Sequence, residues 1–157
     1  MKTNKAMAAA LLKYQIENEF QVIILSKKLQ RLLTGGVCEL KDCIFLEKLL
    51  PKGFNIDEAI RLSFDRTQVE CDVNHIHIED FIDEQGNIEK TILEQGLLFG
   101  ARLQQLLVDK YKFMIIISFS QGQFPDCIVR FHKKRVKENW LVNDIDTYEE
   151  GIAVIDN

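Results

Sequence analysis

The chain has 157 residues, of which 46% are hydrophobic and 28% are charged, and its formal net charge is −4. This balance is typical of one acidic globular domain spanning residues 1–157, and it excludes a chain that is disordered throughout. The four cysteines form no Cys-x-x-Cys pair, and no apolar run approaches the roughly 20 residues of a membrane helix, so we expect a soluble cytoplasmic protein with reduced thiols.

The first predicted element is a long helix over about 5–33. Apolar residues recur along it at intervals of three and four, in two lines that lie on different sides of the helix. The glycines of Gly35-Gly36 end this pattern. A helix with two apolar sides must be covered by more than one neighbour, so it is either central to the fold or part of a homodimer interface.

Residues 40–62 are expected to form two short helical pieces, because Pro51 and Gly53 interrupt an otherwise apolar pattern. From Thr67 the apolar residues alternate, and the phase of the alternation changes near Asp72-Val73-Asn74. Since such a change requires a turn or a bulge, we predict a β-hairpin over residues 67–79.

A second long helix is predicted over about 87–110, with Asn87 as its N-cap. Gly96 and Gly100 lie four residues apart within it. Glycine inside a helix costs about 1 kcal/mol relative to alanine, so we expect both positions to pack closely against a neighbouring element.

The C-terminal third predicts three strands. Two of them form a hairpin over residues 112–134 around Gln121-Gly122-Gln123, and the third covers residues 152–155. We expect a three-stranded antiparallel meander. The predicted fold is therefore α+β, with an antiparallel sheet that includes the 67–79 hairpin and packs against the two long helices.

Alternation places His75, His77 and Glu79 on one face of the 67–79 hairpin. Two imidazoles and a carboxylate are ligands of zinc and related metals, and His132 is the remaining histidine that could complete the set. One hypothesis is thus a divalent-metal site, and a metal-dependent enzyme built around it. The alternative interpretation is a solvated polar strand face.

The second strand of the C-terminal hairpin places Arg130, His132 and Lys134 in one row. Residues 126–137 contain five basic residues and one acidic residue. Such a stripe could bind phosphate, nucleic acid or an acidic protein surface, but it could equally protect an exposed strand from aggregation. No aromatic ladder is interleaved along the strand for stacking on bases, which disfavours nucleic acid.

Acidic residues gather in two stretches, 65–84 and 138–157, and each stretch has a net charge of −6. The sequence contains no phosphate-binding glycine loop, no Gly-x-Ser-x-Gly elbow and no His-Glu-x-x-His motif. These observations favour a non-enzymatic protein-interaction module that binds a protein partner or itself. An immunity or antitoxin-like inhibitor of a basic effector is one concrete form of this hypothesis.

Overall fold

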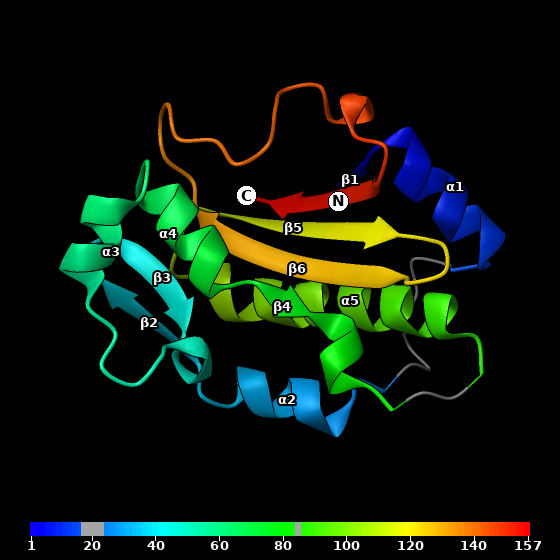
Figure 1. Cartoon of the computed structure of the whole chain (residues 1–157), viewed down its shortest axis with the longest axis horizontal. Helices are drawn as coiled ribbons and strands as arrows, with labels where there is room; N and C mark the ends of the chain where they lie inside the picture. The colour runs from blue at the N-terminus through cyan, green and yellow to red at the C-terminus, as the bar shows by residue number, and fades with distance from the viewer. Residues whose placement is uncertain (17–23, 84–85) are drawn as a thin grey trace.

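The structure is a computed structural model that describes residues 1–16, 24–83 and 86–157. Within these ranges it is an α+β fold of five α-helices, a five-stranded antiparallel sheet in the order β1-β7-β5-β6-β4, and a two-stranded sheet, β2-β3 (Figure 1). The elements are β1 (Lys2–Thr3), α1 (Lys5–Lys13), α2 (Lys27–Leu33), β2 (Val37–Leu40), β3 (Cys43–Leu46), η1 (Glu47–Leu49), α3 (Ile56–Leu62), α4 (Arg66–Val73), β4 (Ile76–His77), η2 (Ile78–Phe81), α5 (Ile88–Leu107), β5 (Phe113–Ser120), β6 (Asp126–Lys133), η3 (Ile145–Thr147) and β7 (Gly151–Asp156). The α+β fold class predicted from the sequence is confirmed.

The helix predicted over 87–110 is confirmed as α5, and the Asn87 side chain accepts a hydrogen bond from the Lys90 amide. Its two glycines let α5 lie directly against the large sheet. A Cβ atom at Gly100 would lie 2.8 Å from Cδ1 of Ile117, and one at Gly96 would overlap Sγ of Cys127. The predicted close packing at both glycines is therefore confirmed.

The large sheet has an inner face, which packs on α5, and an outer face on the opposite side. The segment between β6 and β7 lies across part of the outer face, so the sheet is enclosed between α5 and this segment (Figure 1). Trp140, Leu141, Ile145 and Tyr148 of this segment pack against apolar residues of β5 and β7. The central strand β5 is consequently apolar on both faces.

The hairpin predicted over 112–134 is confirmed as β5 and β6. The predicted meander is wrong in its order, because β7 pairs with β5 rather than with β6. The connection over residues 134–150 crosses the outer face and carries the chain to the other edge of β5. A chain that had turned back directly after β6 would have formed the meander.

The long helix predicted over 5–33 is wrong in its continuity. The helix α1 ends at Lys13, Gln15 adopts a left-handed φ of 53°, and α2 begins after Ser26, whose side chain accepts a hydrogen bond from the Leu29 amide. Residues 17–23, which carry part of the predicted apolar pattern, lie outside the described residues. Leu12, one of the apolar residues in this region, is 81% exposed.

Two further predictions are corrected between residues 37 and 79. The first predicted helical piece is the β2-β3 hairpin, whose turn places Lys41 and Asp42 at φ values of 50° and 67°. The second piece is confirmed as α3. The predicted 67–79 hairpin is instead the helix α4 followed by the short strand β4, and the side chain of Asp65 caps α4.

Two buried polar side chains, one in α4 and one at its C-cap, join the two sheets. The Asn74 amide nitrogen donates to the Ile44 carbonyl of β3 and to the Phe131 carbonyl of β6. The Glu70 carboxylate accepts from the Ile44 amide and from the Lys133 amide. The facing edges of β3 and β6 are thus satisfied by side chains instead of by a further strand.

None of the helices in the described ranges combines the length and the apolar composition needed to cross a lipid bilayer.

Candidate functional site

The basic residues at the end of β6 are held by carboxylates of the chain itself. Arg135 is the most enclosed of them, with a side chain only 11% exposed and its Nη1 atom 2.6 Å from Oε2 of the fully buried Glu70. Burial raises the pKa of the Glu70 carboxyl, whereas Arg135 and the Ile44 amide lower it. The lysines are paired at the surface: Lys133 with Glu39 at 3.0 Å and Asp42 at 2.6 Å, and Lys134 with Asp156 at 2.9 Å.

The other two residues of the predicted basic row have different surroundings. Arg130 donates from Nη2 to Nε2 of His75 at 2.9 Å, and its guanidinium lies 5.6 Å from the centre of the Trp140 ring. His132 is 1% exposed, and its Nδ1 atom lies 2.7 Å from the Lys133 carbonyl. Burial lowers the pKa of His132. Among the predicted row of Arg130, His132 and Lys134, only Lys134 is exposed, and its charge is paired.

The two histidines of the predicted metal site lie together at the edge of the sheet. The rings of His75 and His77 stack with centroids 4.6 Å apart, and Nδ1 of His77 lies 2.9 Å from Oε1 of Glu79. Burial, Arg130 and His77 lower the pKa of His75. Because a guanidinium can only donate, Nε2 of His75 is the acceptor in the bond from Arg130.

His132 is hydrogen-bonded to the Lys133 carbonyl of its own strand. No hydrogen bond among the described residues joins it to the other three residues of the predicted metal site. Across residues 1–16, 24–83 and 86–157, no three side chains of His, Cys, Asp or Glu are placed so that they could hold a metal ion. The metal hypothesis therefore stays a prediction that rests on the His75, His77 and Glu79 contacts alone.

Three acidic residues lie near the closed end of the β5-β6 hairpin. Asp126 is the register partner of Ser120, and Glu150 directly precedes Gly151, which is the partner of Phe119. On the other side of β6, the Glu79 carboxylate accepts a hydrogen bond from the Cys127 amide at 3.2 Å. We name Glu79, Asp126 and Glu150 the acidic row.

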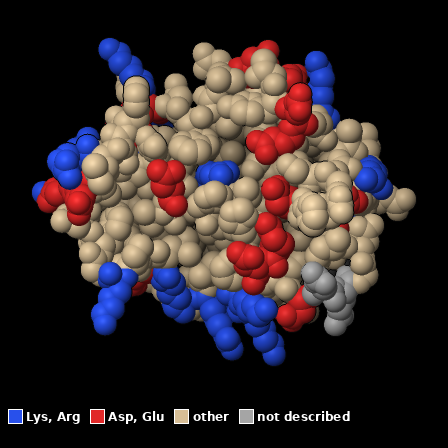
Figure 2. All heavy atoms as spheres, viewed as in Figure 1, with Lys and Arg blue, Asp and Glu red and all other residues tan. Residues whose placement is uncertain are grey.

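The acidic row carries charge that the chain does not fully compensate. Burial and the neighbouring Asp126 raise the pKa of Glu150, and Arg130 opposes this shift. The Oδ1 atom of Asp126 is buried and has no hydrogen-bond partner among the described residues. Figure 2 shows acidic side chains in a column on the face in view, whereas many of the basic side chains gather along its lower edge.

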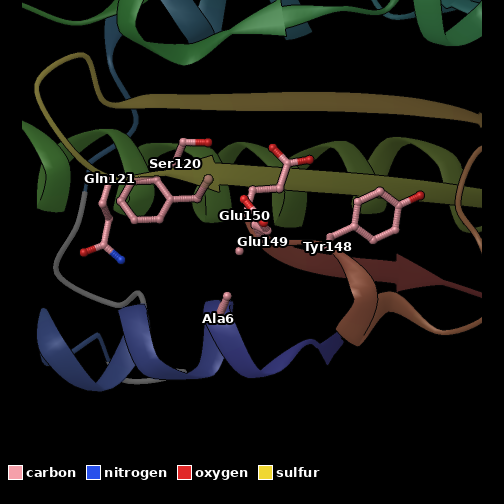
Figure 3. Close-up of a pocket in the computed structure, with 8 residues that line it drawn as sticks. Ala6, Ser120, Gln121, Tyr148, Glu149 and Glu150 are labelled. Carbon is pink, nitrogen blue, oxygen red and sulfur yellow. The ribbon is translucent and has the colours of Figure 1, made fainter.

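A hollow lies on each side of the hairpin end. The first has a volume of about 520 Å³ and is open between α1, β5 and the start of β7; Figure 3 shows Glu150 extending over β5, with Ala6 facing it from α1. It is lined by Ala6, Phe119, Ser120, Gln121, Tyr148, Glu149, Glu150 and Gly151. The second, of about 680 Å³, is lined by His77, Glu79, Gly86, Ile88, Gln123, Phe124, Pro125 and Asp126.

Sequence reasoning did not single out Asp126 or Glu150. Asp126 is the one acidic residue of a segment with a net positive charge, and Glu150 is one of several acidic residues in the stretch 138–157. The sequence feature that could have indicated this site is the clustering of acidic residues in two stretches. The sheet register brings Glu79 from one stretch and Glu150 from the other to the same end of the hairpin.

No curated protein and no solved structure matches the chain. A protein family does match, and the match extends over residues 2–157. It includes the acidic row, both hollows and every strand of the two sheets. The chain therefore belongs to the Uncharacterized protein PM0498 family.

Proposed function

We propose that this chain is a non-enzymatic protein-interaction module that binds a basic partner protein through the acidic row. The observation that carries the proposal is the distribution of ion pairs. Within the described residues, the lysines and arginine at the end of β6 are paired with carboxylates, whereas no lysine or arginine forms an ion pair with Glu79, Asp126 or Glu150.

Uncompensated carboxylates favour a cationic ligand for a physical reason. Like charges at short range raise the free energy of the ionised state, and an added cation removes that cost. Burial is the main cause of the raised pKa of Glu150, and the charge of Asp126 adds such a cost to it. Lysine or arginine side chains of a partner would lower it, and the surrounding negative potential would accelerate encounter with a basic protein.

Two other functions have less support from the described residues. A phosphate-binding or nucleic-acid-binding role would need free cations on β6, but Lys133 and Lys134 are paired and His132 is buried. The Arg130 guanidinium is half-buried and donates a hydrogen bond to His75. A metal-dependent enzyme would need a third ligand beside His77 and Glu79, or another arrangement of three donors, and the described residues offer none.

The proposal includes a cytoplasmic location and the immunity or antitoxin-like form, in which the partner is a basic effector. All four cysteines are free thiols, which suits a reducing compartment. Self-association, suggested by the apolar pattern of the N-terminal region, is the other form that an interaction protein could take. Sedimentation of the purified chain would measure it directly.

The test is capture from an extract of the cells that make the protein. Immobilised wild-type chain is compared with the double variant Asp126→Asn, Glu150→Gln, which removes two charges and preserves side-chain size. The matched control is Glu47→Gln, Asp109→Asn, because both residues are exposed and form no ion pair among the described residues.

We expect the wild type and the control to retain a stoichiometric basic protein at low salt, and the acidic-row variant to lose at least about tenfold of it. Retention should also fall steeply with salt, because dissolved ions screen the attraction between the acidic row and a basic partner. Equal retention by the acidic-row variant, or no stoichiometric partner at all, would contradict the proposal.

A further inference from the structure

The second hollow combines apolar and acidic walls, and we name it the hairpin groove. It lies between the tip of the β5-β6 hairpin and the segment that contains β4 and η2. The residues used below are His77, Glu79, Ile88, Phe124, Pro125 and Asp126. Its volume of about 680 Å³ is large enough for more than one side chain of a docked segment.

The apolar wall centres on Phe124, whose side chain is 85% exposed. Pro125 and Ile88 line the groove beside it. An aromatic ring on a hairpin tip next to other apolar side chains can bury most of its surface against a partner at little cost in conformational entropy. Rings of this kind dominate the binding energy of many protein interfaces.

The acidic wall is formed by two members of the acidic row. Glu79 is held in place from both sides, since Nδ1 of His77 lies 2.9 Å from Oε1 and the Cys127 amide donates to Oε2 at 3.2 Å. Asp126 has its Oδ1 atom buried without a hydrogen-bond partner among the described residues. The charge of Glu79 is therefore fixed in position, and neither Glu79 nor Asp126 forms an ion pair with a lysine or arginine among the described residues.

We infer that the hairpin groove binds a segment of the basic partner in which an apolar side chain is followed directly by lysine or arginine. The apolar side chain packs on Phe124, Pro125 and Ile88, and the cation pairs with Glu79 and Asp126. The inference rests on the proposed function, since it takes the basic partner as the source of the segment. It adds the place of contact and the chemistry of the contacting residues.

Because the groove has one apolar and one acidic wall, a bound segment needs both types of side chain. A cation alone would gain only a partly screened ion pair at a surface site. An apolar side chain alone would leave the two carboxylates without a counter-charge as water is displaced around them, which is unfavourable. A segment that supplies both groups covers the ring and compensates the charge in one contact.

The test titrates isotopically labelled full chain with synthetic hexapeptides and follows amide chemical shifts. The probe is Gly-Ser-Leu-Arg-Ser-Gly with both ends blocked, and the matched peptides replace Leu by Ser or Arg by Glu. We expect the Leu-Arg peptide to shift the amides of Phe124, Asp126 and Glu79 with millimolar affinity. Each matched peptide should produce less than about a tenth of that binding.

Variants separate the two walls. Phe124→Ser and Asp126→Asn should each weaken the Leu-Arg peptide by about tenfold. The matched controls are Phe64→Ser, at a ring that is 98% exposed elsewhere on the surface, and Asp109→Asn, and both should bind the peptide as the wild type does. Each variant retains its far-ultraviolet spectrum if only a surface contact is lost.

Four outcomes would overturn the inference. The first three are no shifts with the Leu-Arg peptide, equal shifts with the peptide in which Glu replaces Arg, and shifts that are unchanged in Phe124→Ser. The fourth is a dimer that is detected by sedimentation and abolished by Phe124→Ser, which would assign the groove to a second copy. The titration needs no natural partner. Failure of the Leu-Arg peptide to bind therefore overturns this inference alone, and the capture experiment separately decides the proposed function.

Discussion

The side-chain nitrogen of Asn74 lies 2.8 Å from the carbonyl oxygen of Ile44, and it also donates to Phe131 of the other sheet at 3.1 Å. The Oδ1 atom of Asn74 accepts from the Leu46 amide at 3.2 Å. Asn74 is fully buried, so these bonds have no competing water. One amide group thus satisfies three backbone groups on two separate sheets.

Replacing Asn74 should test this arrangement. We expect Asn74→Ala to lower the free energy of unfolding by about 2–3 kcal/mol, because buried backbone groups lose their partners. Asn74→Asp should lower it further, by about 3–5 kcal/mol, since a carboxylate would face two carbonyl oxygens without a counter-charge. Urea denaturation measures both, with the exposed Asn143→Asp as the control. An Asp variant as stable as the wild type would contradict the expected donor role.

The contact between α5 and the sheet predicts that alanine is unfavourable at its glycines. Gly96→Ala should destabilise the fold by about 1–3 kcal/mol despite the gain in helix propensity, because its methyl group would overlap Sγ of Cys127. Adding Cys127→Ala should recover at least about 1 kcal/mol as a coupling energy. Thermal or urea unfolding of the four members of this cycle gives the result, and simple additivity would argue against the contact.

The thiols should differ in reactivity. Cys38 is half-buried, whereas the other three cysteines are buried, and burial raises the pKa of Cys43 to about 12. Burial also raises the pKa of Cys127 well above its usual value. N-ethylmaleimide at pH 8 should therefore add once, at Cys38, to the native chain and four times in urea, as measured by intact mass. Fast labelling of two or more native thiols would be inconsistent with the packing.

Acid should destabilise the fold through two histidines, the buried His132 and the exposed His75. Burial lowers the pKa of His132 and of His75 below 6.5, so the unfolded chain binds more protons once the pH falls below that value. The stability from their neutral forms is complete above about pH 7 and is lost as the pH falls toward their folded pKa values. His132→Gln should flatten the dependence of the unfolding free energy on pH between 8 and 5. An unchanged slope would exclude His132 as its source.

The Glu150 carboxylate should lower stability at neutral pH. Burial and Asp126 raise the pKa of Glu150 above 4.5, so stability falls as the pH rises from 4.5 through the folded pKa. Glu150→Gln should therefore melt at a higher temperature than the wild type at pH 7, and the difference should disappear near pH 4. Greater stability combined with weaker partner binding is the pattern expected of a functional site. A lower melting temperature at pH 7 would indicate a structural role for the carboxylate.

The elements that sequence reasoning identified correctly are those with strong local signals. The helix α5 has a capping residue and a long apolar period, and the β5-β6 hairpin has two apolar runs around a glycine turn. The hairpin prediction over 67–79 failed where polar residues are buried. Glu70 of α4 and its C-cap Asn74 are buried, so the apolar residues of that helix appeared to alternate like those of a strand.

The β2-β3 hairpin was missed because neither its burial pattern nor its turn is typical of a hairpin. Four consecutive residues of β3 are buried, which gives no alternation, and the turn uses Lys41 and Asp42 where asparagine and glycine are usual. Of the candidate sites, the contact between His75 and His77 was predictable because these residues lie on either side of Ile76, although only His77 belongs to β4. Pairing of Arg135 with Glu70, and of Lys133 with Asp42, depends on long-range packing that spacing does not encode.

Because one carboxylate, that of Glu70, accepts from the Ile44 amide of β3 and the Lys133 amide of β6, two amide protons on different sheets share a single acceptor. Local opening of α4 would release both protons to solvent in the same event. Amide exchange at Ile44 and Lys133 should then proceed at a common opening rate. The junction would behave as one cooperative unit although the chain builds it from two separate sheets.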